Sequence, residues 1–238
     1  MLTSTNLWNE VFVCPEESDF YSDCLESLVL SQCHGSEAVV EFGSGDGAPV
    51  INTLLKSNFK GIIYGFEINS AAYRLAKSRI QSHNLSSKYS IQNCCFFEEV
   101  NVEAEYLVSN PPYLPALDDK LYQPRLHGGT DGTEIARRLL SLGYDNVLLM
   151  VSSYSNPEGL INYAASQGYS VSNFLVSPLR FGYYSSEPKV KNTIVQLRQH
   201  KKAFYSSNIY LLAGVLFKKQ TELVVDLSQE LIQVLTAL

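Results

Sequence analysis

Short apolar runs alternate with helical patterns along the chain. Apolar residues recur at helical spacing in five segments, which are residues 19–31, 50–56, 70–82, 133–141 and 157–166. Runs typical of buried strands lie around them and begin near Val39, Ile62, Tyr89, Tyr106, Val147 and Ser170. Alternation of this kind predicts an α/β fold, in which helices cover both faces of a mostly parallel sheet.

Two segments near the carboxyl end extend this pattern. Residues 209–217 are apolar almost throughout and predict a seventh strand, and residues 221–238 predict a final helix with one apolar stripe. The stripe consists of Leu223, Leu227, Leu231 and Leu235. We interpret it as core packing, and a partner-binding helix is the alternative. The predicted organisation is an N-terminal segment and helix (1–35), one α/β domain (36–218) and a C-terminal helix (219–238).

Composition limits the class of protein. With 238 residues and 45% hydrophobic content, the chain can bury the core of one compact domain. No apolar stretch is long enough to span a bilayer, and residues 1–8 lack the basic region and apolar core of a signal peptide. We therefore expect a cytoplasmic protein. The five cysteines have no paired spacing and indicate reduced thiols, and the four scattered histidines predict no metal site.

A glycine-rich turn follows the first predicted strand. The run 38–42, which contains Glu41, leads into a turn formed by Gly43, Ser44, Gly45, Asp46 and Gly47, and a helical pattern comes next. Glycines let main chain approach a ligand where a Cβ would collide. The spacing matches neither the dinucleotide fingerprint nor the P-loop.

An acidic residue ends the second predicted strand. Glu67 follows the run 61–66, about 20 residues past the glycines, where a carboxylate can accept both hydroxyls of a ribose. We assign Ile68, the next residue, to the same site. A glycine turn combined with such an acid indicates a cofactor that contains a nucleoside.

The most informative motif is Asn110-Pro111-Pro112-Tyr113, at the end of the run 106–109. The Asn110 amide oxygen and a proline-flanked carbonyl can both accept hydrogen bonds from one NH₂ group, and the prolines fix these acceptors. The ring of Tyr113 offers a face for a flat substrate. The motif indicates chemistry on a planar nitrogen; a proline turn that ends a strand is the alternative for four residues alone. Because both motifs follow ends of parallel strands, we expect them to share one pocket.

The order of these motifs resembles the S-adenosylmethionine-dependent methyltransferases that act on amide or exocyclic amine nitrogen. The chain is most similar to the release-factor glutamine N5-methyltransferase group. Residues 11–19 resemble the segment before the first helix of that group, and residues 126–138 resemble its Gly-Gly-x-Asp-Gly stretch. The resemblance covers roughly the first two-thirds of the chain.

The resemblance implies a single Rossmann-like methyltransferase domain with a seven-stranded, mostly parallel sheet and an antiparallel last strand. It implies S-adenosyl-L-methionine as the cofactor. The residues assigned to cofactor binding are Ser18, Glu41, Gly43, Ser44, Gly45, Gly47, Glu67, Ile68, Asn93, Cys94 and Asn110. The group usually has an aspartate after the third strand, and here Asn93 can accept the hydrogen bond from the adenine amine in its place. The residues assigned to catalysis are Asn110, Pro111, Pro112 and Tyr113.

The expected activity is methyl transfer to a planar amide or amine nitrogen, with a protein glutamine-type amide favoured. Adenine in RNA or DNA, a small amine or amide, and a non-catalytic cofactor-binding scaffold are the alternatives, and any partner subunit is unknown. Bacterial members of the group carry an N-terminal helical domain, and we expect none ahead of Val11. A basic and aromatic cluster lies within 176–206. Its members are Arg180, Tyr183, Tyr184, Lys189, Lys191, Arg198, Lys201 and Lys202. A solvated helix face is the favoured interpretation, because the net charge of −6 disfavours a polyanion.

Overall fold

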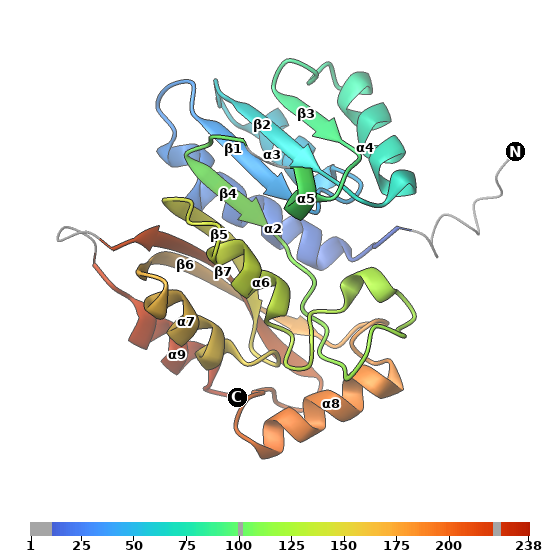
Figure 1. Ribbon diagram of the computed structural model, residues 1–238, viewed down its shortest axis with the longest axis vertical. Helices are drawn as coiled ribbons and strands as arrows, with labels where there is room; N and C mark the ends of the chain where they lie inside the picture. The colour runs from blue at the N-terminus through green and yellow to red at the C-terminus, as the bar shows by residue number, and fades with distance from the viewer. Residues whose placement is uncertain (1–10, 100–101, 221–224) are drawn as a thin grey trace, which may run out of the picture. The chain divides into compact units, whose positions relative to one another are not determined.

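The computed structural model describes residues 11–99, 102–220 and 225–238 (Figure 1). Seven strands of this described part follow the sheet order β3-β2-β1-β4-β5-β7-β6. By its internal contacts the chain divides into two compact units, Met1–Asn110 and Pro111–Leu238, and each unit is described in turn.

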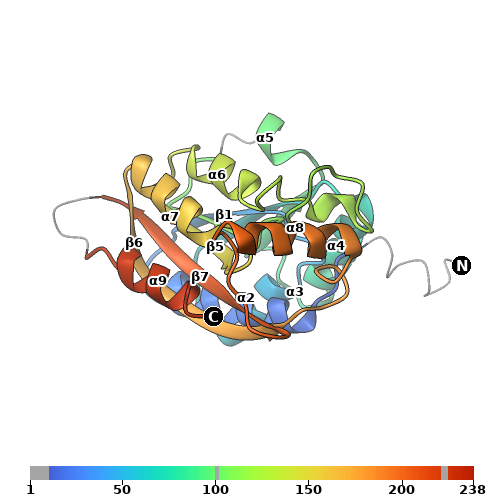
Figure 2. The same cartoon turned by 90° about the horizontal axis from the view of Figure 1, so that it is seen from below.

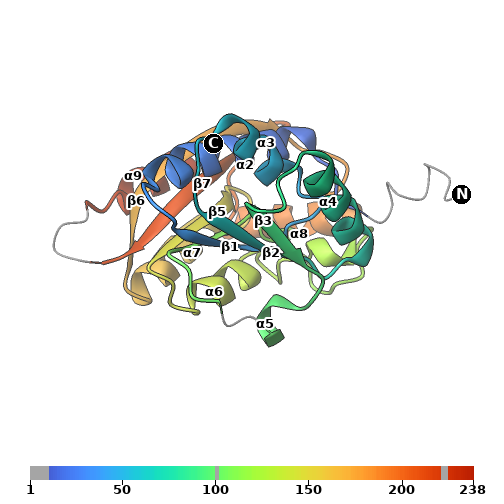
Figure 3. The ribbon, with the colours of Figure 1, turned by 90° about the horizontal axis from the view of Figure 1, so that it is seen from above.

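The first unit alternates helices and parallel strands. In chain order its described elements are α2 (Pro15–Leu28), the 3₁₀ turn η1 (Leu30–Gln32), β1 (Ala38–Phe42), α3 (Ala48–Lys56), β2 (Ile62–Phe66), α4 (Ser70–Ser82), β3 (Tyr89–Gln92), α5 (Phe96–Glu99) and β4 (Tyr106–Ser109). Strand β1 pairs in parallel with β2 and β4, and β2 pairs in parallel with β3. Figures 2 and 3 place α2 and α3 on one face of these strands and α5 on the other. Val39, Ile63 and Leu107 are fully buried in the core between these layers.

The second unit is built on antiparallel strands. Its described elements are η2 (Pro124–Leu126), α6 (Glu134–Leu140), β5 (Asn146–Ser152), α7 (Pro157–Ser166), β6 (Tyr169–Arg180), α8 (Pro188–Gln199), β7 (Ile209–Lys219) and α9 (Ser228–Leu235). Strand β7 lies between β5 and β6 and runs antiparallel to both. The predicted seventh strand and its direction are thus confirmed.

Two helices match their predicted bounds, and a strong capping signal accounts for where each begins. Asn69 precedes α4 and accepts a hydrogen bond of 3.0 Å from the Ala71 N–H. Asn156 precedes α7, accepts one of 3.3 Å from the Gly159 N–H, and is followed by Pro157 in the first turn. Side-chain caps of this kind satisfy main-chain donors that a helix leaves without partners.

Other predicted bounds were wrong. Helix α2 begins at Pro15, four residues before the predicted start, because proline fits a first helical turn, and it ends at Leu28. Strand β6 continues to Arg180, so the predicted connection 176–206 begins later, and α8 lies within it. The short helix α5 was not predicted.

The C-terminal helix is shorter than predicted. Helix α9 spans Ser228–Leu235, and Leu227 is its N-cap. Leu231 and Leu235 are fully buried and the helix packs against α7 and β6, which confirms the interpretation as core packing. Leu223 lies outside the described residues. Among the described helices, none is both long and apolar enough to cross a membrane.

Candidate active site

The glycine turn adopts the backbone that its sequence predicts. Gly43, Gly45 and Gly47 have φ of 70°, 57° and 74°, the left-handed region that side chains other than glycine rarely adopt. A Cβ at Gly43 or Gly45 would meet no atom within 4 Å, so the turn leaves open space where a ligand can approach the main chain. At Gly47 a Cβ would lie 3.1 Å from the Cβ of Ala76 on α4.

Glu67 fastens the turn to the end of β2. One of its carboxylate oxygens accepts a hydrogen bond of 2.7 Å from the Gly45 N–H, and the other accepts one of 2.6 Å from the Asn69 N–H. The side chain is only 8% exposed. Each carboxylate oxygen has more than one acceptor position, so a hydrogen bond from the main chain does not exclude one from a ribose hydroxyl. Ile68, which follows, is 59% exposed and offers an apolar side chain beside this carboxylate.

Asn93 joins the end of β3 to the end of β2. Its amide Nδ2 donates to the Glu67 main-chain carbonyl at 2.6 Å, and its Oδ1 accepts from the Ser70 hydroxyl at 2.8 Å. Asn93 Oδ1, the predicted acceptor for the adenine amine, therefore already accepts one hydrogen bond, from Ser70. Cys94, the next residue, is half-buried. Ser18 lies half-buried in the first turn of α2, in the same unit.

Glu41 lies in the core at the end of β1. It is 1% exposed, and its two oxygens accept hydrogen bonds from Tyr89 at 2.6 Å and from Tyr21 at 3.3 Å. Burial raises the pKa of Glu41 to about 7 against the lowering effect of these bonds, and the negative charge of Glu67 adds to the rise. The predicted role of Glu41 at the cofactor stays a prediction.

Sequence reasoning missed both tyrosines, and one signal pointed to Tyr89. A Cβ at Gly65 on β2 would lie 2.8 Å from the Tyr89 ring and would also collide with the Ser44 hydroxyl. A glycine inside a strand often marks such a close approach. Gly65 thereby leaves the space that Tyr89 needs to reach Glu41.

Asn110 ends the first unit with a buried acceptor. The Ser109 hydroxyl donates to the Phe42 carbonyl at 2.9 Å, which ties the residue before Asn110 to the residue before Gly43. The Asn110 Oδ1 atom is buried and has no hydrogen-bond partner in the part of the chain that the structure describes. Buried polar atoms are normally paired, so the unpaired oxygen at this strand end makes Asn110 a candidate for contact with a ligand.

The other three residues of the motif, Pro111, Pro112 and Tyr113, belong to the second unit, which binds the main chain of Tyr113. The Tyr113 carbonyl accepts a hydrogen bond of 2.8 Å from the Ser155 hydroxyl, and the Tyr113 ring packs on the Tyr154 ring at a centroid distance of 5.9 Å. Tyr113 is 8% exposed, Pro111 is buried and Pro112 is half-buried. The motif is thus a supported turn rather than a mobile loop end.

The Gly-Gly-x-Asp-Gly stretch supports this turn directly. A Cβ at Gly128 would lie 2.6 Å from the Tyr113 Cα and 2.8 Å from the Pro112 carbonyl oxygen. A Cβ at Gly132 would lie 2.5 Å from the Tyr113 carbonyl oxygen. Only glycine allows the two stretches of main chain to approach this closely.

A polar network holds the glycine stretch in place. Asp131 accepts hydrogen bonds from the Thr133 hydroxyl and from Asn156, both at 2.6 Å, and lies 3.7 Å from Arg137. Burial opposes ionisation of Asp131, but these hydrogen bonds and the Arg137 charge outweigh it and hold its pKa below the ordinary value.

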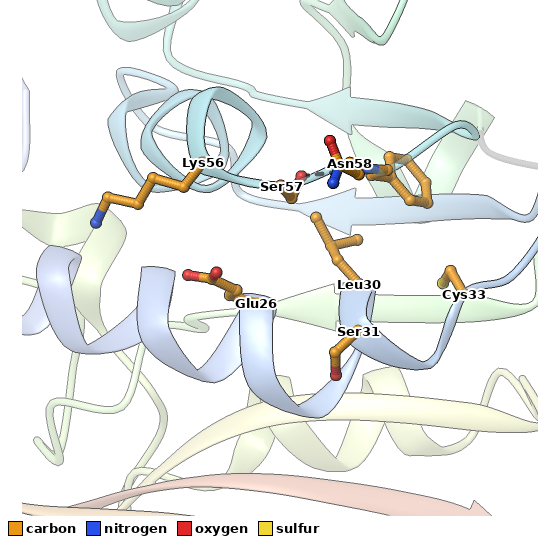
Figure 4. A pocket seen from close by; sticks show the side chains of 8 residues that line it. Glu26, Leu30, Ser31, Cys33, Lys56, Ser57 and Asn58 are labelled. Carbon is orange, nitrogen blue, oxygen red and sulfur yellow. Dashed lines mark hydrogen bonds between the residues drawn. The ribbon is translucent and has the colours of Figure 1, made fainter.

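A separate pocket of about 330 Å³ lies in the first unit, and Figure 4 shows side chains that line it. It is lined by Glu26, Leu30, Ser31, Cys33, Lys56, Ser57, Asn58 and Phe59. Cys33 precedes β1 and Phe59 precedes β2, so the pocket lies at the amino ends of these strands, whereas Gly43 and Glu67 follow their carboxyl ends. Ligands of open α/β sheets bind at the carboxyl ends, so this pocket is not the candidate site. The described residues contain no cluster of acidic, cysteine and histidine side chains that could hold a metal ion.

Comparison with known proteins relates this geometry to a group of enzymes. No family model matches the chain. The release factor glutamine methyltransferase of Dictyoglomus turgidum is 28% identical over 148 residues, which cover 56% of this chain and 50% of the relative. The enzyme of the same name from Thermosynechococcus vestitus is 27% identical over 146 residues, covering 56% and 47%. In sequence, the chain is similar to release factor glutamine methyltransferases. It spans about half the length of these curated relatives.

Solved structures confirm the fold. A methyltransferase from Geobacter sulfurreducens, solved with S-adenosylhomocysteine, matches with a TM-score of 0.53 at 12% identity over 87% of this chain and 92% of that one. The geranyl diphosphate C-methyltransferase of Streptomyces coelicolor matches with a TM-score of 0.51 at 8% identity, over 86% and 79%. The predicted Rossmann-like methyltransferase fold is therefore present. Because the second enzyme is named for methylation of carbon, the fold leaves the acceptor atom open.

Proposed function

We propose that the chain is an S-adenosylmethionine-dependent methyltransferase that methylates the side-chain amide nitrogen of glutamine in a protein. The observation that carries this proposal is the buried, unpaired Oδ1 atom of Asn110 at the end of β4. The names of the two relatives agree with it. The S-adenosylhomocysteine complex of a protein with the same fold supports the choice of cofactor.

The glycine turn and Glu67 are the residues that fit the cofactor. The open face of Gly43 and Gly45 suits the amino-acid portion, and the Glu67 carboxylate, already fixed by two N–H groups, suits a ribose. Bound S-adenosylmethionine supplies a methyl group that its attachment to a sulfonium makes electrophilic.

The chemistry of the acceptor rests on Asn110 and Pro111. The Asn110 Oδ1 accepts one N–H of the substrate amide and the Pro111 carbonyl accepts the other. These two bonds hold the nitrogen and direct its lone pair towards the methyl group, so positioning replaces a strong base. A nitrogen–carbon bond forms as the carbon–sulfur bond breaks, and the nitrogen releases one proton to water.

A protein amide is favoured over adenine because the positive charge of the second unit's basic cluster is reduced by an ion pair. Lys189 of this cluster pairs with Asp118. The net charge of −6 also disfavours a polyanion.

The test uses the full chain, methyl-labelled S-adenosylmethionine and a cell extract separated into protein, RNA and small molecules. We expect label in the protein fraction, with methylglutamine found by mass spectrometry of proteolytic peptides. Asn110→Ala should abolish transfer and keep affinity for S-adenosylhomocysteine, because the residue serves the reacting nitrogen. Asn58→Ala, an exposed asparagine of the same unit, should behave as the parent. Methyladenine in the RNA fraction would show that adenine, and not a protein amide, is the acceptor. A lack of label in every fraction would refute methyl transfer.

A further inference from the structure

Two exposed tyrosines lie together on the second unit. Tyr122 is 57% exposed and Tyr183 is 69% exposed, and their ring centroids are 5.5 Å apart with planes inclined by 31°. Leu117, in the same loop as Tyr122, is 75% exposed. Large apolar side chains that gather on a surface mark positions that another molecule covers.

The main chain under these side chains is fixed. The Tyr122 N–H donates to a carboxylate oxygen of Glu187 at 2.8 Å. Lys189 forms an ion pair with Asp118 and donates to the Lys120 carbonyl at 3.1 Å. Helix α8 and the residue before it therefore hold the loop that carries Leu117 and Tyr122. A surface whose backbone is already ordered loses less entropy when it binds.

The tyrosine pair lies close in the chain to the aromatic residues that pack on the nitrogen-binding motif. Tyr122 lies in the loop that begins at Tyr113, nine residues earlier in the chain. Tyr183 follows Phe181 by two residues, and the Phe181 ring stacks on Tyr154 at 5.5 Å, which in turn packs on Tyr113 at 5.9 Å. Because Phe181 and Tyr154 connect the backbone next to Tyr183 to Tyr113, the residues that flank an acceptor held by this motif would lie near the pair.

Charge selects the kind of molecule that fits. In residues 114–130 the acidic Asp118 and Asp119 balance the basic Lys120 and Arg125. Residues 180–191 add Glu187 against Arg180, Lys189 and Lys191, so the two segments together carry an excess of only two positive charges. Such a surface provides no concentrated positive field for a phosphate backbone. Tyrosine rings pack on extended main chain and apolar side chains, and their hydroxyls bond to peptide groups.

We propose that Tyr122 and Tyr183 form the docking surface for the substrate segment that flanks the acceptor glutamine, and that this segment is extended and uncharged. The inference rests on the proposed function. The proposed function names the glutamine that is methylated, and the inference names the neighbouring segment by which the enzyme recognises the protein substrate. Both residues act on binding of the flanking segment and contact no reacting atom.

The experiment compares two kinds of acceptor with the full chain and S-adenosylmethionine. One is a set of short synthetic peptides with a central glutamine flanked by uncharged, acidic or basic residues. The other is N-acetylglutamine amide, which has no flanking segment. We expect the uncharged peptides to be methylated best. The double variant Tyr122→Ala, Tyr183→Ala should raise KM for them about tenfold with kcat retained, as for loss of an aromatic anchor. Transfer to the small amide should not change.

Two controls separate docking from folding. The variant Tyr122→Phe, Tyr183→Phe keeps both rings and should retain most of the affinity for the peptides. Leu142→Ala, which shortens a side chain that is 46% exposed after α6, should behave as the parent.

The other outcomes overturn the inference in distinguishable ways. An unchanged KM in the alanine variant, or an equal loss with peptide and small amide, would leave the proposed function standing and remove the docking role. Inhibition of the parent by a single-stranded oligonucleotide that the alanine variant escapes would assign the surface to nucleic acid. If the parent methylates neither kind of acceptor, the proposed function itself fails and this inference falls with it.

Discussion

The Ser109 hydroxyl donates a hydrogen bond of 2.9 Å to the Phe42 carbonyl, and Ser109 is fully buried. One bond thereby joins the ends of β1 and β4, and the glycine turn and Asn110 follow directly after these ends. We expect Ser109→Ala to destabilise the fold by about 1–3 kcal/mol, because the Phe42 carbonyl would lose its donor. Urea unfolding measures this change. Transfer should fall by more than affinity for S-adenosylhomocysteine does.

Ser141→Ala is the matched control, because that hydroxyl donates to the Arg137 carbonyl at an exposed helix end. It should change stability by less than about 0.5 kcal/mol. Equal effects of the two serine variants would show that the Ser109 bond has no special role.

Glu67→Ala should weaken cofactor binding. The variant removes the acceptor for Gly45 and Asn69 as well as the proposed acceptor for ribose. Hydrogen bonds to charged groups contribute about 1.5–3 kcal/mol, so we expect roughly a tenfold to hundredfold rise in Kd. Calorimetric titration with S-adenosylhomocysteine measures it, and NAD should not bind to the parent. An unchanged Kd would remove Glu67 from the site.

Glu41 should make stability depend on pH. Its folded pKa of about 7 lies above the ordinary value of 4.5, so the folded state favours the protonated form. This contribution is fully present below about pH 4.5 and is lost as the pH rises through about 7. Glu41→Gln keeps the shape and cannot ionise. The parent should therefore lose stability relative to the variant between about pH 5 and about pH 8 in urea unfolding. Parallel curves for the two proteins would contradict the raised pKa.

Two glycines with nearly the same φ allow the cost of backbone strain to be distinguished from the cost of a steric collision. Gly132 and Gly143 have φ of 80° and 82°, but a Cβ at Gly143 meets nothing within 4 Å, whereas one at Gly132 meets the Tyr113 carbonyl and Ser155. Gly143→Ala should cost about 1–2 kcal/mol from the left-handed backbone alone. Gly132→Ala should cost more and also lower kcat. If the two variants match in stability and kcat, the close approach at Tyr113 is unimportant.

Salt dependence tests the basic cluster. Lys201 and Lys202 are exposed beyond α8. For a protein acceptor we expect a shallow dependence of substrate binding on salt, and little change in Lys201→Ala, Lys202→Ala. A nucleic-acid acceptor would give a steep slope that this variant flattens by about two units. Binding of an RNA oligonucleotide at several salt concentrations decides between them.

Signals from neighbouring residues in the sequence predicted helix starts and the glycine turn, because the side chains and backbone of a few adjacent residues determine these features. The starts of α4 and α7 follow from capping asparagines, and the glycine turn follows from three residues that tolerate positive φ. The predicted end of β6 was too early. Its last residues are strand because they pair with β7, about 30 positions away in the chain, and local patterns do not reveal that pairing.

The candidate site was predictable only in its motifs. A glycine within β2 indicates a close approach there, but it does not identify Tyr89 as the hydrogen-bond donor to Glu41. The bond between Ser155 and Tyr113 has no signal in the sequence, because it joins segments more than 40 residues apart. The unpaired state of the Asn110 oxygen likewise depends on what surrounds it in three dimensions.

The buried position of Glu41 also means that folding exchanges protons with the solvent. Near pH 6 this carboxyl is ionised in the unfolded chain and mostly protonated in the folded one, so folding takes up close to one proton from the buffer at this group. The heat measured for folding will therefore include the ionisation heat of the buffer. Phosphate and imidazole buffers should give different apparent enthalpies for the same transition, and Glu41→Gln should bring them together.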